Sequence, residues 1–150
     1  MLKQKKSALM KATDLLANQE QSSTVLRQKL LARHYDVAEV DDALAKLKKY
    51  NYLDDAEACR RQFENFYADG RLSVRQIVAK LIQRGFDKDF IERLIPDDSA
   101  TRELDVALKL LTKKFSAATF DKAKAWQFLS SRGFDGEIIS EAVENFQQAE

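Results

Sequence analysis

The chain has 150 residues, 45% hydrophobic and 33% charged, so it can build one sizeable core or several small ones, which excludes disorder as its dominant state. Its 25 basic and 24 acidic side chains give a net charge of +1, too little to hold the whole molecule on nucleic acid or an anionic membrane. The only cysteine and the only histidine, Cys59 and His34, exclude an internal disulfide and a structural zinc site of three or four soft ligands.

No run of apolar residues is longer than three, which argues against a membrane-spanning helix and against the apolar centre of a secretion signal. We therefore expect a soluble, cytoplasmic protein. With only four glycines and one proline among many strong helix formers, the composition predicts helix almost throughout. In chain order, the apolar periodicity and the start and stop signals predict helices over 5–18, a segment ending near 33, 36–49, 54–69, 73–84, 87–95, 99–116, a segment ending near 132, and 135–147.

A repeated motif divides the chain into three parts. Its copies are Leu30-x-x-Arg33-His34-Tyr35-Asp36, Leu81-x-x-Arg84-Gly85-Phe86-Asp87 and Leu129-x-x-Arg132-Gly133-Phe134-Asp135, separated by steps of 51 and 48 residues. Apolar residues recur at the same offsets after each copy. The pattern predicts three units of three helices, over residues 1–52, 53–97 and 98–150, stacked into an elongated, curved, all-α array of helix-turn-helix-like repeats.

Each motif copy has the composition of a corner between two helices. Gly85 and Gly133 stand where a helix end needs a left-handed residue, and His34 replaces glycine there at a cost of about 1 kcal/mol. The aromatic residue precedes an aspartate at the next N-cap and is predicted to pack on an aliphatic residue four positions into that helix. These hydrophobic staples pair Tyr35 with Val40, Phe86 with Ile91, and Phe134 with Ile139.

Two further helix starts carry capping signals: Asp54 with Glu57, and Ser73 with Gln76, each have the spacing of a capping box. Motifs for catalysis are missing, since the sequence has no glycine-rich phosphate loop, HExxH, CxxC or nucleophile elbow. Adjacent carboxylates occur at helix starts, where capping explains them. We therefore expect neither an enzyme nor a bound cofactor or metal.

Basic residues are the better functional signal. Two of them, Arg60 and Arg61, have acids at i,i+4 spacing, which we expect to pair them as Glu57–Arg61 and Arg60–Glu64 on a solvated face. The other four lack an acid at helical spacing within their own helix and are the stronger candidates for binding a partner. They are Arg71, Arg75, Lys80 and Arg84. Tyr52 and Tyr67 lie beside apolar helix faces and are expected in the core.

Several of these segments together resemble the RecX regulatory proteins of bacteria. The resemblance rests on Leu47-x-x-Tyr-Asn-Tyr-Leu-Asp-Asp55, on Ile77-x-x-x-Leu81-x-x-x-Gly85-Phe86 and on Leu129-x-x-Arg132-Gly133-Phe134, and it extends over about residues 7–147. The sequence departs from the family where Ser73 replaces a glycine-containing turn and where Pro96 shortens the last helix of the second unit.

The resemblance implies a negative regulator of the RecA recombinase. Such a protein lies in the groove of the RecA filament on single-stranded DNA, contacts adjacent protomers, and inhibits ATP hydrolysis, strand exchange and coprotease activity. We expect a monomer with weak or indirect nucleic-acid contact and no membrane contact.

Two alternatives stay open: a helix-turn-helix DNA-binding protein and a scaffold of helical repeats for some other protein. The acids that open the third helix of each unit argue against the first, because they would repel phosphates.

Overall fold

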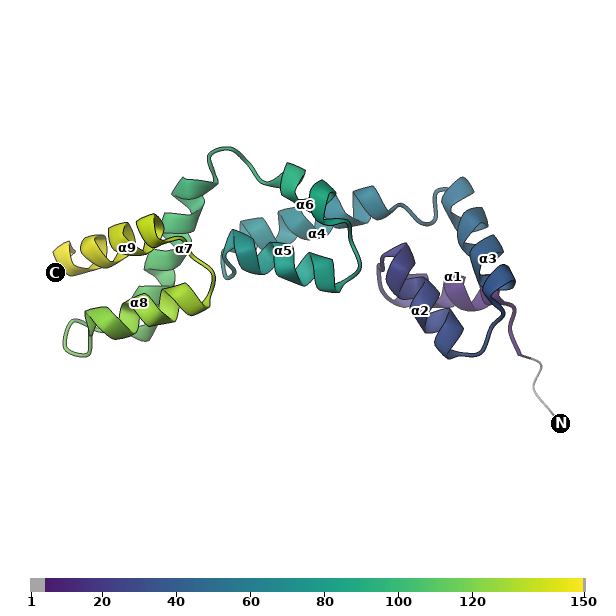
Figure 1. Cartoon of the computed structure of the whole chain (residues 1–150), viewed down its shortest axis with the longest axis horizontal. Helices are drawn as coiled ribbons and strands as arrows, with labels where there is room; N and C mark the ends of the chain where they lie inside the picture. The colour runs from purple at the N-terminus through teal and green to yellow at the C-terminus, as the bar shows by residue number, and fades with distance from the viewer. Residues whose placement is uncertain (1–4, 150) are drawn as a thin grey trace.

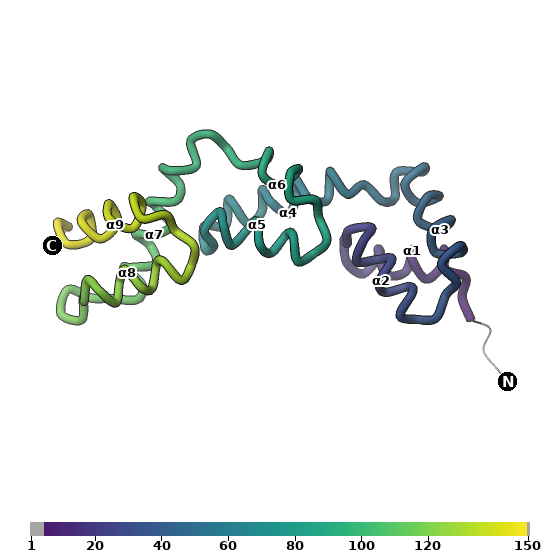
Figure 2. Tube along the Cα trace, viewed as in Figure 1, coloured from purple at the N-terminus to yellow at the C-terminus, as the bar shows by residue number. Residues whose placement is uncertain are grey.

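The computed structural model describes residues 5–149, and the regular structure in that range is entirely helical, as the composition predicts. Successive triplets of helices follow one another along an elongated, curved array (Figures 1 and 2). We refer to α1–α3 as unit one, α4–α6 as unit two and α7–α9 as unit three. The helices are α1 (Ala8–Asn18), α2 (Ser23–Ala32), α3 (Val37–Lys49), α4 (Asp55–Asp69), α5 (Val74–Gln83), α6 (Lys88–Leu94), α7 (Ser99–Lys114), α8 (Lys122–Ser131) and α9 (Gly136–Gln148).

Each unit buries its own small set of apolar side chains. In unit one these include Leu26 and Leu30, in unit two Ile77 and Leu81, and in unit three Leu129. All five are fully buried. A small core buries too little surface to be stable alone, so each unit depends on its neighbours. The domain limits at residues 52/53 and 97/98 stay a prediction.

The three corners have the same backbone geometry. Gly85 and Gly133 have φ of 90° and 85°, and His34 adopts the same left-handed region with φ of 67°. In unit two, the Gly85 N–H donates to the Ile82 carbonyl at 2.9 Å and the Phe86 N–H donates to the Leu81 carbonyl at 3.1 Å, which is a Schellman motif. The same two bonds recur in the other units. The corner thus tolerates histidine without a change of turn.

The staple residues are buried as predicted, but the aspartates beside them differ in role. Tyr35, Phe86 and Phe134 are each at most 9% exposed and share a core with their aliphatic partners. Only Asp87 caps its helix with a side-chain bond, accepting from Phe90 N at 3.0 Å. Asp36 and Asp135 occupy N-cap positions without such a bond, so the prediction of a capping side chain was wrong there.

The Ser73 capping box is complete, with the Ser73 hydroxyl accepting from Gln76 N at 3.1 Å and Ser73 N donating to Gln76 Oε1 at 3.2 Å. At α4, the Asp54 carboxylate accepts from Glu57 N at 3.1 Å, without the reciprocal bond of a box.

The N-cap serines also join the units. Ser22 Oγ donates to the Arg84 carbonyl at 2.6 Å, and Ser73 Oγ donates to the Arg132 carbonyl at 2.5 Å. Each bond links the start of the second helix in one unit to the corner of the next. In unit one, the corresponding carbonyl of Arg33 accepts instead from Lys5 Nζ at 2.9 Å.

An acidic side chain strengthens each junction. The Asp55 carboxylate at the start of α4 accepts from Ser23 N at 2.7 Å and from the Ser23 hydroxyl, and the Glu103 carboxylate on α7 accepts from Val74 N at 3.0 Å. Each acid therefore satisfies a backbone N–H in the first turn of the preceding unit's second helix, a group that has no partner within its helix. The same set of contacts repeats at both junctions, which fixes a repeated rotation between units.

The corner glycines are needed for this close approach as well as for their φ. A Cβ at Gly85 would lie 2.7 Å from Ser22 Oγ, and a Cβ at Gly133 would lie 3.1 Å from Arg75 Cβ. Since real Cβ atoms do not approach other atoms as closely as 2.7 Å, any side chain at Gly85 would push the junction serine away.

Replacing Gly85 by alanine should therefore lower the free energy of unfolding by roughly 2–4 kcal/mol, from left-handed strain and from crowding of Ser22. Chemical denaturation measures this effect. The matched control is Gly136→Ala in α9, where the new Cβ would meet Trp126 at an ordinary 3.9 Å and stability should change by less than about 1 kcal/mol. Equal effects of the two substitutions would contradict the role given to the corner glycine.

The single cysteine belongs to the core of unit two. Cys59 is 1% exposed. Burial, together with the carboxylates of Asp55 and Asp87, raises the pKa of its thiol to about 11. The thiolate is the reactive form, so the folded protein should be a poor thiol nucleophile at neutral pH.

At pH 8, a disulfide reagent should react with Cys59 about a hundredfold more slowly in the folded protein than in denaturant. The reason is that a pKa raised by about two units lowers the fraction of thiolate about a hundredfold. Absorbance of the released thiol follows the reaction. A variant with Ala45→Cys, at an exposed position of α3, should release one fast equivalent when folded. Fast labelling of the unsubstituted, folded chain would show that the core of unit two opens readily.

Candidate partner-binding surface

The six candidate cations all lie in unit two. Arg60 and Arg61 belong to α4, and Arg71 lies in the connection from α4 to α5. Arg75 and Lys80 belong to α5, and Arg84 caps its C-terminus. The six residues therefore lie on two adjacent helices and the loop between them, but their contacts differ.

Lys80 and Arg84 meet on one aromatic ring. Lys80 Nζ lies 5.0 Å and the Arg84 guanidinium carbon 5.1 Å from the centre of the Phe66 ring, which belongs to α4. Cations at this distance are attracted to the ring face. These two candidates thus form a positively charged cluster held by the packing of α5 on α4.

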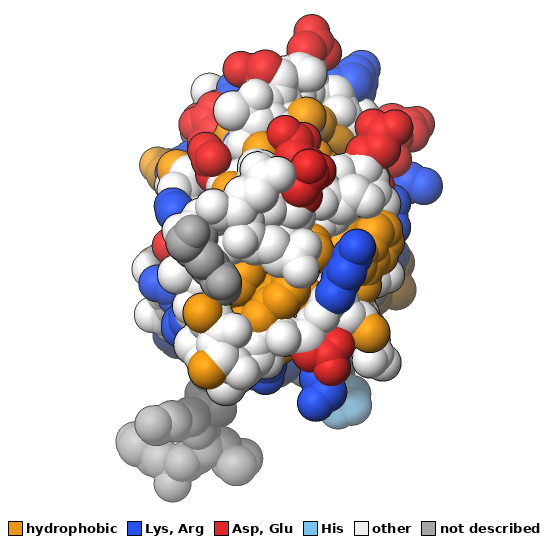
Figure 3. All heavy atoms as spheres, turned by 90° about the vertical axis from the view of Figure 1, so that its left-hand side faces the viewer, with side chains coloured by type: hydrophobic (Ala, Val, Ile, Leu, Met, Phe, Trp, Pro, Cys, Tyr) orange, Lys and Arg blue, Asp and Glu red, His pale blue; other side chains and the backbone are white. Residues whose placement is uncertain are grey.

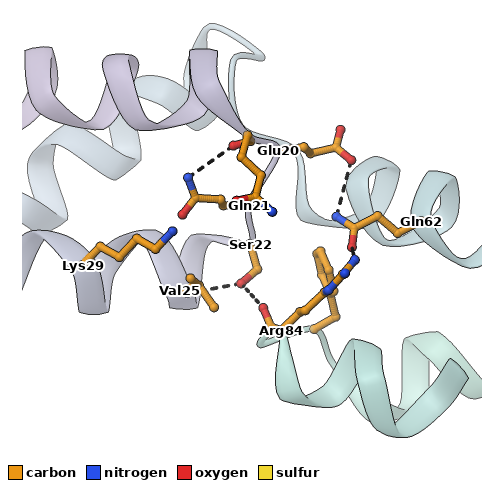
Figure 4. A pocket seen from close by; sticks show the side chains of 9 residues that line it. Glu20, Gln21, Ser22, Val25, Lys29, Gln62 and Arg84 are labelled. Atoms are coloured by element: carbon orange, nitrogen blue, oxygen red, sulfur yellow. Dashed lines mark hydrogen bonds between the residues drawn. The ribbon is translucent and has the colours of Figure 1, made fainter. Parts of the chain in front are cut away.

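Arg84 also lies at the junction between units one and two. Its guanidinium donates to Gln62 Oε1 at 2.7 Å, and Gln62 Nε2 lies 3.5 Å from Glu20 Oε1, so that Gln62 stands between the two charged residues (Figure 4). These residues line a small pocket of about 80 Å³ with Lys29. Arg84 therefore serves the junction and leaves only part of its charge for a partner.

Arg71, in the connection between α4 and α5, and Arg75, in α5, each pair with an acid of another element. Arg71 pairs with Asp69 at 3.1 Å and Arg75 with Asp135 of unit three at 3.3 Å. Both arginine side chains are largely exposed, at 82% and 71%. Exposed ion pairs contribute little to stability, so these guanidinium groups can exchange their acids for those of a partner.

The predicted ion pairs of Arg60 and Arg61 were wrong. Arg60 pairs with Glu57 one turn earlier at 2.8 Å, and Arg61 pairs with Glu20 of unit one at 3.2 Å. The i,i+4 rule fails here because an acid of another unit lies within reach of Arg61. Both residues are thus engaged within the array.

The two tyrosines differ in burial. Tyr67 is half-buried and stacks on Phe63 with ring centres 5.6 Å apart, and burial raises the pKa of its phenol. Tyr52, however, is 74% exposed and Tyr50 is 64% exposed, so placing Tyr52 in the core was wrong. Between them, Asn51 has φ of 62°, in the left-handed region, where the chain turns after α3.

Charges of both signs are spread over the surface. Figure 3 views the end of the array that carries the C-terminus, and neither the acidic nor the basic side chains cover that face as one patch. The third helix of each unit has an acid in its first turn, namely Glu39, Asp89 and Glu137. Such helices are poorly suited to lie along DNA phosphates.

Two negative findings apply to residues 5–149. No group of three or more His, Cys, Asp or Glu side chains in this range is arranged to hold a metal ion. Every helix in this range falls short of the length and apolarity that crossing a bilayer requires.

Arg102 of α7 was not among the residues singled out from the sequence, although its guanidinium makes four hydrogen bonds. Its side chain is 13% exposed and donates to carbonyls of unit two, and it also pairs with Glu103 at 2.7 Å. No motif or spacing marks it. By contrast, the repeat step of 51 residues from Ser73 could have identified Ser22 as the other junction serine.

Comparison with known proteins finds the same fold and relatives along nearly the whole chain. A family profile described as "RecX, third three-helix domain" matches residues 101–143. Among solved structures, RecX from Lactobacillus salivarius superposes with a TM-score of 0.79 at 16% identity, covering 94% of this chain and 95% of that one. A second structure, of a regulatory protein RecX, has a TM-score of 0.77 at 18% identity, covering 91% and 73%.

Sequence relatives are closer. The regulatory protein RecX of Neisseria meningitidis serogroup C is 31% identical over 150 residues, covering 96% of this chain and 94% of the relative. A regulatory protein RecX of Thermus thermophilus is 36% identical over 135 residues, covering 90% and 89%. Since relatives above 30% identity align over almost their full length, and the three-unit fold agrees, the chain belongs to the RecX family of regulatory proteins.

Proposed function

We propose that this protein is a negative regulator of the RecA recombinase. It lies in the groove of the RecA filament on single-stranded DNA, spans adjacent protomers, and inhibits ATP hydrolysis, strand exchange and coprotease activity. We further propose that it acts in the cytoplasm as a monomer, without a catalytic site or cofactor of its own, and that units one to three are domains bounded at residues 52/53 and 97/98.

The observation that carries this proposal is the repeated junction. The same serine-to-carbonyl bond joins unit one to unit two and unit two to unit three, so the molecule is a long body of defined curvature. A body of this kind can touch several subunits of a filament at once, and many modest contacts on one rigid scaffold add to a high combined affinity. Holding neighbouring subunits together opposes the movements that a filament ATPase needs.

Within this proposal, the contacts come from the cations of unit two. Arg71 and Arg75 are the principal candidates because their side chains are exposed and their ion pairs are weak. Lys80 and Arg84 add charge beside Phe66, and Arg60 and Arg61 contribute less because acids of the array already engage them.

Substoichiometric amounts of the protein should slow the single-strand-dependent ATPase of RecA. Replacing Arg71, Arg75, Lys80 and Arg84 by alanine should raise the concentration for half-inhibition roughly tenfold to thirtyfold, since four charged contacts of about 0.5 kcal/mol each sum to about 2 kcal/mol. Because Lys80 and Arg84 pack on Phe66, thermal unfolding must accompany the assay, and the double variant of Arg71 and Arg75 alone should retain a clear loss.

The matched control removes the same charge elsewhere, by alanine at Lys113, Lys114, Lys122 and Lys124 of unit three, and should inhibit like the parent chain. An unchanged ATPase rate with excess protein would refute the regulator proposal. Binding to DNA alone, with a steep salt dependence, would instead favour the DNA-binding alternative.

A further inference from the structure

The two junctions between units share a backbone but differ at one buried position. In the second junction, the Arg102 guanidinium of α7 enters the end of unit two. It donates to the carbonyls of Tyr67 at 3.1 Å, Leu72 at 2.7 Å and Phe66 at 3.3 Å. Its guanidinium carbon also lies 4.7 Å from the centre of the Tyr67 ring. The guanidinium thus links unit three to unit two.

The repeat steps identify the corresponding place in the first junction. Tyr67 and Leu72 correspond to Leu16 and Gln21 at the step of 51 residues, and Arg102 corresponds to Asp54 at the step of 48. A carboxylate therefore stands where the second junction has a guanidinium. Leu16, Gln21 and Asp54 together line a pocket of about 190 Å³.

The charges around this pocket suit a cation. Besides Asp54, the pocket is lined by Glu20 and Glu57, against a single basic residue, Arg61. Glu20 pairs with Arg61, and Glu57 pairs with Arg60 on the exposed side of α4. The lining thus keeps an excess of negative charge at the position where Arg102 places a positive charge in the second junction.

Gln21 adds an unsatisfied acceptor. The residue is 6% exposed, and its Nε2 donates to the carbonyls of Leu15 at 2.9 Å and Gln19 at 3.2 Å, which fixes the orientation of the amide. Its Oε1 is buried and has no hydrogen-bond partner within the described structure. Gln21 also lines the smaller pocket beside Arg84 (Figure 4). A buried acceptor without a donor costs free energy, which an entering donor group would recover.

Tyr52 completes the comparison. It lines the pocket and its side chain is 74% exposed, so a ring is available at the mouth of the first pocket, as the Tyr67 ring is available to Arg102 in the second junction. An exposed tyrosine beside an acidic pocket is a common arrangement for holding an arginine.

From these observations we infer that the pocket at the first junction binds the side chain of an arginine presented by a protein partner. The guanidinium donates to the carbonyls of Leu16 and Gln21, in the manner in which Arg102 binds Tyr67 and Leu72. Asp54 and Glu57 balance its charge, and the Tyr52 ring covers it. The planar guanidinium selects arginine over lysine, because its donors are spread over three nitrogens, all of which Arg102 uses in the second junction, whereas those of lysine share one nitrogen.

A titration with N-acetyl-arginine methylamide, followed by nuclear magnetic resonance, tests this inference on the free protein. We expect saturable shifts of the Gln21 side-chain amide and of the backbone amides of Tyr52 and Ala58. The lysine analogue should bind at least about fivefold more weakly, and the neutral citrulline analogue should not shift these signals.

Asp54→Asn keeps an N-cap residue but removes the charge, and it should weaken the arginine probe about threefold to tenfold. Asp36→Asn, at the N-cap of α3, is the matched control and should bind like the parent chain. Gln21→Met should also lose affinity, with the remaining spectrum reporting that unit one stays folded. Absence of saturable shifts, equal binding of the lysine analogue, or unchanged binding to the Asp54 variant would each overturn the inference.

This experiment contains no recombinase, so its failure would leave the proposed function standing, and failure of the ATPase assay would leave the pocket standing. Where both succeed, the Asp54→Asn variant should also require a higher concentration than the parent to inhibit RecA.

Discussion

The bond from an N-cap serine to a corner carbonyl is the contact on which the rest of the structure depends. It recurs at both junctions, where the contacts of Asp55 and Glu103 with the same helix starts support it. Ser22 and Ser73 each use one hydroxyl both to cap their own helix and to bind the next unit. The start of the helix and the packing of the next unit therefore depend on the same side chain. The glycine that ends the neighbouring helix makes room for the serine. The same serine, carbonyl and glycine thus set the angle between neighbouring units at both junctions.

The features that the sequence predicted well are those determined within a few residues. The corners at Gly85 and Gly133 follow from helix-end chemistry, and the staples follow from an aromatic residue at a fixed distance from an aliphatic one. Because the corner motif occurs three times along the chain, these local signals also predicted a fold of three units. Even the histidine corner keeps this geometry, and Tyr35 and Leu30 on either side of it are buried in the core of unit one.

Contacts between units could not be predicted in this way. The pairing of Arg75 with Asp135, or of Arg61 with Glu20, depends on how one unit is rotated against the next, and no spacing within a helix encodes that rotation. Tyr52 was misplaced because it follows the left-handed turn at Asn51, beyond the end of α3, where the periodicity of the helix no longer applies. Arg102 shows the limit most clearly: it lies on a helix with ordinary periodicity, yet it bonds to three carbonyls of another unit.

The two junctions hold the three units in one fixed relative orientation. Residual dipolar couplings of backbone amides in a single aligned sample test it directly, because units that move together share one alignment tensor. We expect one tensor to fit the couplings of all three units with the coordinates of the whole array. Couplings that need a separate tensor of different magnitude for any unit would contradict it.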